Sequence, residues 1–325
     1  MELMSLLFYM ICAAVFGGGG ACLIARFGAR LNILDRANHR SSHTGAVPKG
    51  GGIGILFTFV IVAAQTGFSA AFWVPAAALS LISFMGDRVD LSVKLRLGVQ
   101  FFCAVIVLGG FFSSVGLTCF YLLPVMALFI VGTANIYNFM DGIDGIAGIT
   151  AVNAFGLLGL YAYKIGAGEP YMILALAMSV SSFAFLFFNL PKARVFMGDV
   201  GSVLLGFVFA SMVVFLSGNI VDFFCMSGFL FLFYMDEITT MAVRYKNGES
   251  LTKAHRKHLY QLLANEMGLS HWKVAAGYGL FQWGIAFSVL FCRPHGMGLI
   301  LLLYTVYTIL FFIFSNSVRK KVLIQ

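Results

Sequence analysis

The chain of 325 residues is long enough for two soluble domains, but 60% of its residues are hydrophobic and only 10% are charged. Soluble proteins are about half apolar and one quarter charged, so this composition excludes a soluble globule. The mean hydropathy is +0.94, and apolar segments occur along the whole chain. This predicts repeated membrane spans of about 20 residues. In a membrane protein the net charge of +8 reports on loop orientation, and no nucleic-acid partner is expected.

Eleven apolar segments follow one another along the chain, each bounded by Gly, Pro or charged residues. They are continuously apolar and do not alternate with a period of two, which favours helices over the strands of a barrel. The sequence therefore predicts an all-α polytopic membrane protein with about eleven transmembrane helices, forming one membrane domain over residues 1–325. The expected spans are residues 3–25, 51–67, 70–86, 97–113, 119–139, 146–163, 170–190, 200–218, 223–242, 272–292 and 297–315.

The basic residues predict the orientation of these spans. An odd number of spans puts the termini on opposite sides, and Arg319, Lys320 and Lys321 assign the carboxyl end to the cytoplasm. Every Lys and Arg except Lys164 and Arg293 then lies on the cytoplasmic side. We expect a periplasmic N-terminus, a cytoplasmic C-terminus and a location in the bacterial inner membrane. The catalytic face is expected in the cytoplasmic loops 26–50, 86–96, 139–146, 190–200 and 243–271.

Acidic residues gather at the predicted cytoplasmic ends of the spans. Carboxylates near hydrocarbon are costly, and several at one opening repel one another unless a cation joins them. Mg²⁺ uses one or two carboxylates together with substrate phosphate oxygens and water. Basic loops beside such a cluster therefore point to a diphosphate substrate held between metal and Arg or Lys.

The strongest motif is NIYNFMDGIDG at residues 135–145, at the end of a predicted span. Asn135 and Asn138 share a helical face, and the glycines permit a turn that brings Asp141 and Asp144 towards one opening. Capping of a helix end would explain one of these residues but not all four. The motif therefore predicts a polar site at the membrane surface.

A second motif comprises Asn189 and the segment FMGDVGS at residues 196–202. It places Asp199 at the expected amino end of a span, where the helix dipole and free amides favour anions. Taken alone, Asp199 and Ser202 would also be explained as a helix N-cap pair. Beside the first motif, we interpret Asp199 as part of the same site.

Two further segments carry basic groups. HRKHLYQ at residues 255–261 places His255 and His258 on one helical face; an interfacial helix touching anionic lipid headgroups is an alternative explanation for this segment. The first long loop contains Lys49 followed by three glycines, which permit close approach of backbone to a ligand.

In this order and on this side of the membrane, the motifs resemble the polyprenyl-phosphate N-acetylhexosamine-1-phosphate transferases of glycosyltransferase family 4, over about residues 26–262. The HRKHLYQ segment and RSSHT at residues 40–44 are more similar to the branch that initiates O-antigen synthesis. The cell-wall branch usually carries a His-rich triplet instead.

The resemblance implies roles for individual residues. Asp199 would be the principal ligand of Mg²⁺, with Mn²⁺ as the alternative ion. Catalytic roles would fall to Asp87, Asp141 and Asp144, the last two lining the nucleotide pocket. The implied substrate-binding residues are Lys49, Asn138, Asn189, Phe196, His255, Arg256 and His258.

One position departs from the family pattern. The family carries adjacent aspartates at the end of the third span, whereas this chain has Gly86 followed by Asp87. A phosphate monoester acceptor has a second pKa of about 6 and is largely dianionic at neutral pH, so it needs less help from a protein base than a hydroxyl would. We hypothesise that Asp87, assisted by Asp90, takes over part of the missing role.

The sequence is therefore interpreted as an enzyme that transfers N-acetylhexosamine-1-phosphate from a UDP-sugar to undecaprenyl phosphate and releases UMP, initiating O-antigen or related cell-surface polysaccharide synthesis. Its expected partners are undecaprenyl phosphate, a UDP-N-acetylhexosamine and membrane lipids, and a homodimer is left open. Two alternatives remain: a transporter or flippase for an anionic metabolite or lipid, and a family member silenced by Gly86.

Overall fold

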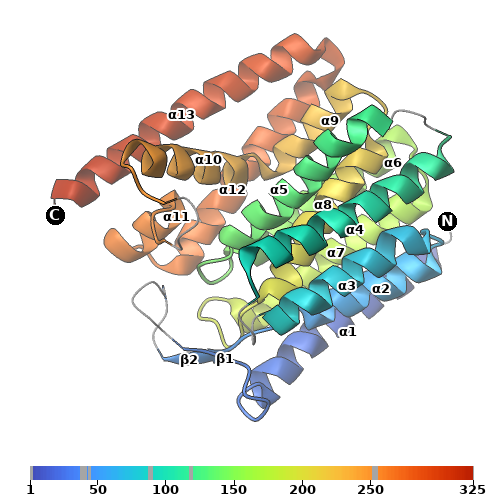
Figure 1. The fold of residues 1–325 in the computed structure, drawn as a ribbon, viewed down its shortest axis with the longest axis horizontal. Coiled ribbons are helices and arrows are strands. Elements are labelled where there is room, and N and C mark those ends of the chain that lie inside the picture. The colour runs from blue at the N-terminus through green and yellow to red at the C-terminus, as the bar shows by residue number, and fades with distance from the viewer. Residues whose placement is uncertain are drawn as a thin grey trace.

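The computed structural model describes residues 3–36, 42, 45–86, 91–116, 120–250 and 255–324. Helices dominate these ranges, and one short hairpin accompanies them (Figure 1). The helices are α1 (Leu3–Phe27), α2 (Ile53–Gln65), α3 (Ala70–Gly86), α4 (Val93–Ser114), α5 (Leu123–Phe139), α6 (Ile146–Ile165), α7 (Glu169–Asn189), α8 (Asp199–Leu216), α9 (Ile220–Ser227), α10 (Phe231–Lys246), α11 (Leu259–Gln261), α12 (His271–Cys292) and α13 (Met297–Ile324). The hairpin pairs β1 (Leu34–Arg36) with β2 (Ala46–Pro48) in antiparallel register.

Within the described ranges, seven helices are long and apolar enough to cross a membrane: α1, α4, α6, α7, α8, α12 and α13. Three further apolar helices, α2, α3 and α5, coincide with predicted spans but are shorter than these seven. The all-α polytopic membrane architecture is confirmed. The count of eleven spans and their direction stay predictions.

The segment expected to cross at residues 223–242 is not one helix. It is divided into α9, a 3₁₀ turn at Gly228–Leu230, and α10. Gln282 of α12 forms hydrogen bonds with the backbone at this break. Its amide nitrogen donates to the Gly228 carbonyl, and its oxygen accepts from the Leu232 amide. Backbone groups released by a broken helix need such partners where water is scarce.

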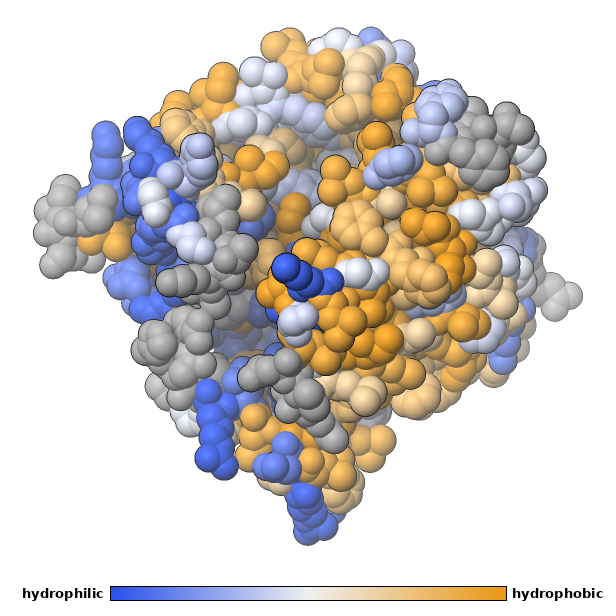
Figure 2. Space-filling model, in the orientation of Figure 1, coloured by the Kyte–Doolittle hydropathy of each residue, from blue (hydrophilic) through white to orange (hydrophobic). Residues whose placement is uncertain are grey.

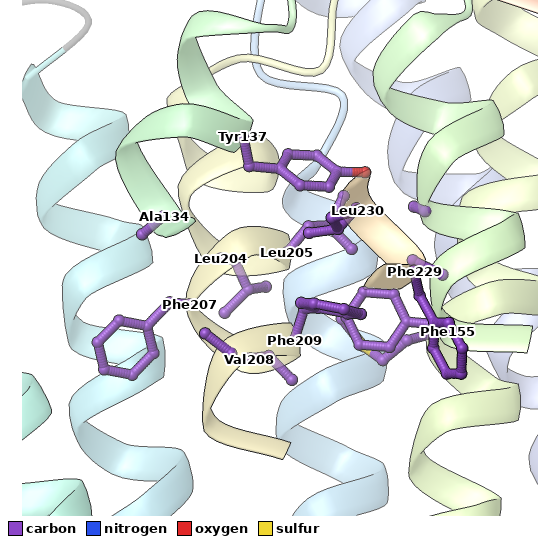
Figure 3. Packing of buried hydrophobic residues seen from close by; sticks show 14 of the residues in the cluster. Ala134, Tyr137, Phe155, Leu204, Leu205, Phe207, Val208, Phe209, Phe229 and Leu230 are labelled. Atoms are coloured by element: carbon purple, nitrogen blue, oxygen red, sulfur yellow. The ribbon is translucent and has the colours of Figure 1, made fainter. Parts of the chain in front are cut away.

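Helix α8 forms the centre of the molecule, and 89% of its most apolar 18-residue stretch is buried. It packs mainly against α5 and α3. Figure 3 shows Phe209 of α8 meeting Phe155 of α6 and Phe229 of the 3₁₀ turn, while Phe207 points to the opposite side of α8. Because both sides of α8 are packed, the position of its first residue, Asp199, is determined by several neighbouring helices.

The outer helices are apolar but exposed. Only 17% of the apolar stretch of α1 and 11% of that of α13 is buried. Figure 2 shows hydrophobic residues over much of the bundle, whereas hydrophilic residues gather at the end that carries α11 and the hairpin. Apolar side chains on an outer surface are typical of helices in contact with lipid.

The two ends of the bundle differ. Helix α1 begins at one end and α13 finishes at the other, beside α11 (Figure 1). The hairpin and the loop from α5 to α6 lie at the same end as α11. At the opposite end, the guanidinium of Arg293 lies 2.7 Å from the Asp222 carboxylate. The polar segments named by the sequence motifs thus meet at one end of a helical bundle.

Candidate active site

Two segments far apart in sequence lie side by side at the start of α8. The Phe196 amide donates to the Pro48 carbonyl at 2.8 Å, and the Phe196 carbonyl accepts from the amides of Gly50 and Gly51. The Gly52 amide donates to the Met197 carbonyl at 2.9 Å. A side chain at Gly52 would come within 2.5 Å of the Gly201 Cα, so this close backbone approach requires glycine.

The approach brings Lys49 to Asp199. The Lys49 ammonium nitrogen lies 3.5 Å from Asp199 Oδ1, and Arg96 Nη1 lies 4.0 Å from Oδ2. The side-chain amide of Asn138, at the end of α5, donates to Asp199 Oδ1 at 3.1 Å and to Ser202 Oγ at 2.9 Å. The predicted motifs at residues 135–145 and 196–202 therefore meet directly.

The alternative explanation of Asp199 and Ser202 as an N-cap pair does not match the geometry. The residue at the N-cap of α8 is Gly198, which has no capping side chain. The Ser202 hydroxyl donates to the Gly198 carbonyl at 3.2 Å. Asp199 lies in the first helical turn, where the dipole favours a negative charge.

The loop between α5 and α6 is tied to the segment after α7. The Gly145 amide donates to Asn189 Oδ1 at 2.7 Å, and the Asn189 side-chain nitrogen donates to the Val195 carbonyl at 2.9 Å. Asp144 Oδ2 accepts from the Ala193 amide at 3.2 Å. Asn189 thus joins two backbone segments of the site.

These segments surround a pocket of about 230 Å³. Seven predicted site residues line it: Lys49, Asn138, Asp141, Asp144, Asn189, Phe196 and Asp199. The other lining residues are Asp35, Ser42, Gly142, Ile143, Gly198, Gln261 and His271. The carboxylates of Asp35, Asp141, Asp144 and Asp199 outnumber the single Lys, so the pocket is suited to a cation together with an anionic ligand.

The structure does not bring the basic segment 255–258 into this lining. His258 is buried with 3% of its residue surface exposed, and its ring lies 4.7 Å from that of His255. Arg256 forms an ion pair with Glu266 at 2.8 Å. From the segment at residues 255–261, Gln261 is the residue that lines the pocket.

The environment of both histidines favours their neutral form. Burial lowers the pKa of His255 to about 4, assisted by its interactions with the neighbouring His258 and with the positive charge of Arg244. Burial also lowers the pKa of His258 to about 3, with Arg319 and Arg244 as further causes. Neutral imidazoles are weaker partners for a diphosphate than the cationic loop predicted from the sequence. Asp87 lies outside the described residues.

Asp35, Gln261 and His271 are among the lining residues that the sequence did not predict as site residues. His271 begins α12, and its Nδ1 lies 3.2 Å from Asp144 Oδ2 and accepts from the Asp144 amide at 3.3 Å. Asp35 belongs to β1, and Gln261 was seen only as the end of the basic segment. No spacing connects His271 to a motif 127 residues earlier.

The donor set suits a magnesium ion. Among the described residues, no group of three or more His, Cys, Asp or Glu side chains is arranged to hold a metal on its own. Mg²⁺ takes only one or two carboxylates and completes its shell with water and phosphate oxygens. The oxygen of Asp199 beside the other pocket carboxylates meets that requirement, whereas a closed site for zinc would need more ligands.

The glycosyl transferase family 4 pattern matches residues 69–217. A protein of Thermotoga maritima named undecaprenyl-phosphate alpha-N-acetylglucosaminyl 1-phosphate transferase is 30% identical over 240 residues, covering 73% of this chain and 76% of the relative. The chain belongs to glycosyl transferase family 4. A Bacillus subtilis relative, named as a probable enzyme of the same kind, is 27% identical over 57% of this chain and 56% of its own length. An Escherichia coli K12 relative with the Thermotoga protein's name is 28% identical over 55% of this chain and 53% of its own.

The glycosyl transferase family 4 match extends from α3 to α8. It contains Asn138, Asp141, Asp144, Asn189 and Asp199. Other parts of the pocket come from outside the matched region: Lys49 precedes it, and Gln261 and His271 follow it. The pocket of this family member is therefore completed by the hairpin, α11 and α12.

Proposed function

We propose that the protein transfers N-acetylhexosamine-1-phosphate from a UDP-N-acetylhexosamine to undecaprenyl phosphate and releases UMP. The observation that carries the proposal is the convergence of Lys49, Asn138 and Asp199 in an acidic pocket at one end of a membrane bundle. The names of the relatives make UDP-N-acetylglucosamine the first donor to test.

The reaction is a displacement at phosphorus. An oxygen of the acceptor phosphate attacks the β-phosphorus of the UDP-sugar, the bond from that phosphorus to the bridging oxygen breaks, and UMP leaves with the bridging oxygen. Such transfers depend on positioning and on neutralising charge more than on covalent chemistry by the protein. A bound Mg²⁺ would supply charge neutralisation and orientation of phosphate oxygens.

The pocket residues have distinct roles in this proposal. Asp199 would hold the metal, and the Asn138 amide fixes the orientation of its carboxylate. Lys49 and Arg96, which lie near Asp199, contact the phosphate oxygens of the donor and acceptor. Asp141 and Asp144 shape the donor side, and His271 orients Asp144.

The finer setting of the reaction is also proposed. The pocket end faces the cytoplasm of a bacterial inner membrane, where UDP-sugars are made, and the product initiates O-antigen or a related polysaccharide. The distribution of Lys and Arg along the sequence supports this orientation.

The transporter alternative is less well supported. Transporters of many folds bind their substrate near the middle of the membrane, at helix breaks between internal repeats. Here the pocket carboxylates belong to loops and helix termini at one end of the bundle. At the break between α9 and α10, the freed backbone groups bind Gln282, and none of the residues there lines the candidate pocket.

The test is turnover by purified, detergent-solubilised protein with undecaprenyl phosphate, Mg²⁺ and a panel of UDP-N-acetylhexosamines. We expect UMP release that requires both acceptor and metal. The rate of release should fall by about 100-fold or more in Asp199→Ala. Chelation should abolish the wild-type rate, and return of Mg²⁺ should restore it. Glu266→Gln is the matched control, because Glu266 is an acidic residue paired with Arg256 outside the pocket.

Two results would count against this function. Absence of UMP release from all donors, together with uptake of a labelled sugar nucleotide by proteoliposomes, would favour transport. UMP release that survives in Asp199→Ala would remove the metal role from that residue.

A further inference from the structure

The short helix α11 forms one wall of the pocket and is held from behind by a buried carboxylate. Asp236 of α10 has no exposed surface. Its oxygens accept from the Leu259 amide at 2.7 Å and from the Tyr260 amide at 3.2 Å. The hydroxyl of Tyr278, from α12, donates to the same carboxylate at 2.7 Å. Asp236 therefore fastens α11 to two longer helices.

Tyr260 connects α11 to the loop that carries the catalytic aspartates. Its side chain is fully buried, and its ring stacks on His258 with the planes 11° apart. Its hydroxyl donates to the carbonyl of Phe139 at 3.1 Å. Phe139 is the last residue of α5, two residues before Asp141.

Tyr260 also lies close to Gly142 of the same loop. A methyl group at Gly142 would overlap the Tyr260 hydroxyl, so the absence of a side chain there allows the ring to reach the loop backbone. Gln261, the residue after Tyr260, lines the pocket and accepts from the His258 amide at 3.3 Å. The register of α11 thus sets both the pocket wall and its contact with the loop.

The other half of the loop has its own attachments. Asn189 binds the Gly145 amide, and the Ala193 amide binds Asp144. The Tyr137 hydroxyl donates to the Ala147 carbonyl at 2.6 Å and joins the two helices that flank the loop. Tyr260 connects α11 to the half of the loop that contains Asp141.

We propose that Tyr260 is a positioning residue for the transfer reaction. Its hydroxyl holds the Phe139–Gly142 backbone so that Asp141 faces the pocket, and Asp236 keeps Tyr260 in place. The inference rests on the proposed function and deepens it. It assigns the segment at residues 255–261 a role in shaping the pocket in place of the direct phosphate contact expected for His255, Arg256 and His258.

The test compares two variants that each remove one hydroxyl. Tyr260→Phe deletes the bond to the Phe139 carbonyl. Tyr304→Phe is the matched control, because the Tyr304 hydroxyl also donates to a backbone carbonyl, that of Phe224, and Tyr304 is not a pocket residue. Both variants keep the aromatic ring, so both are expected to fold with similar thermal midpoints.

We expect kcat of Tyr260→Phe to fall about tenfold, which corresponds to about 1.4 kcal/mol of transition-state stabilisation, while KM for the UDP-sugar changes less than threefold. Amide hydrogen exchange in the peptide containing residues 139–145 is expected to become faster in this variant, because the loop opens more easily. Tyr304→Phe is expected to match the wild type in both measurements.

Each other outcome overturns the inference. Unchanged exchange in residues 139–145 would mean that the hydroxyl does not hold the loop. Faster exchange with unchanged kcat would mean that the contact is structural only. If the wild type itself shows no turnover, the proposed function fails and the catalytic role falls with it, while the exchange comparison still decides whether Tyr260 holds the loop.

Discussion

At the residue scale, the site depends on pairs of side chains that neutralise or orient each other. Lys49 lies beside Asp199, Asn138 orients the same carboxylate, and His271 lies against Asp144. The first two contacts join residues named by sequence motifs. The third involves a histidine that no motif marked, because its partner is distant in sequence and the contact exists only after α12 has packed on the loop.

The departure at Gly86 gives a prediction for single residues. A Cβ at position 86 would approach Leu91 Cδ1 to 3.3 Å, a contact with the flexible end of a side chain, so Gly86→Asp is expected to fold. If Asp87 has taken over part of the missing role, Asp87→Asn should lower turnover by about 100-fold, and Gly86→Asp should raise it by less than about tenfold. Turnover by purified variants, compared with Glu266→Gln, measures both.

A different pattern would change the assignment. An increase of about tenfold or more in Gly86→Asp would show that position 86 is catalytically vacant in this chain. Activity that appears only in Gly86→Asp would identify a silenced family member.

At the element scale, α11 and the segment before it show how a basic sequence folds into a buried unit. Arg256 and Lys257 are paired with Glu266 and Glu249, and His258 is enclosed between α10 and α13, with Glu237 3.5 Å from its Nε2. The i, i+3 spacing correctly suggested that His255 and His258 lie together, since their rings are in contact. It could not show that they point into the protein, because that depends on the helices behind them.

The burial of these histidines predicts a pH dependence of stability. The pKa of His258 is lowered to about 3 in the folded protein, against about 6.5 in an unfolded chain. Between these values the unfolded chain binds more protons, so stability is present above about pH 6.5 and falls as the pH is lowered.

We expect the thermal midpoint of the wild type to decrease between pH 6.5 and 4.5 by about 2 °C per pH unit more than that of His258→Asn. Thermal unfolding in detergent measures the difference. Arg244 and Arg319 oppose protonation of His258, whereas the carboxylates of Asp236 and Glu237 face it from α10. Parallel pH curves for the two proteins would show that His258 does not titrate on unfolding in this range.

At the scale of the whole molecule, the two ends of the bundle have different chemistry. One end carries the pocket and α11. At the other, Asp222 accepts hydrogen bonds from Tyr161 and Arg293 and from the side chain of Asn219. Arg293 is one of the two basic residues that the sequence predicts outside the cytoplasm, and its ion pair with Asp222 neutralises its charge.

This difference leads to a topology prediction. A fluorescent protein fused after Gln325 should fluoresce in cells, because we expect that end in the cytoplasm. Alkaline phosphatase inserted in the turn at Gly166–Gly168, between α6 and α7, should be active, because we expect that turn outside. A non-fluorescent fusion together with an inactive phosphatase insertion would show that the pocket faces outwards. Cytoplasmic UDP-sugars would then be excluded as substrates.

The sequence by itself determined the membrane class, the helical architecture and most of the polar residues that line the pocket. Continuous apolar runs admit few structures other than helices in hydrocarbon, and polar residues at their ends remain visible against an apolar background. Only the tertiary structure decided which residues complete the site and which way the basic segment faces. His271 and Gln261 reach the pocket because α12 packs against α6 and α11 against α10, and Asp35 reaches it because the hairpin leads into the Lys49–Phe196 bridge. Such contacts depend on the packing of whole helices, which no local spacing along the chain encodes.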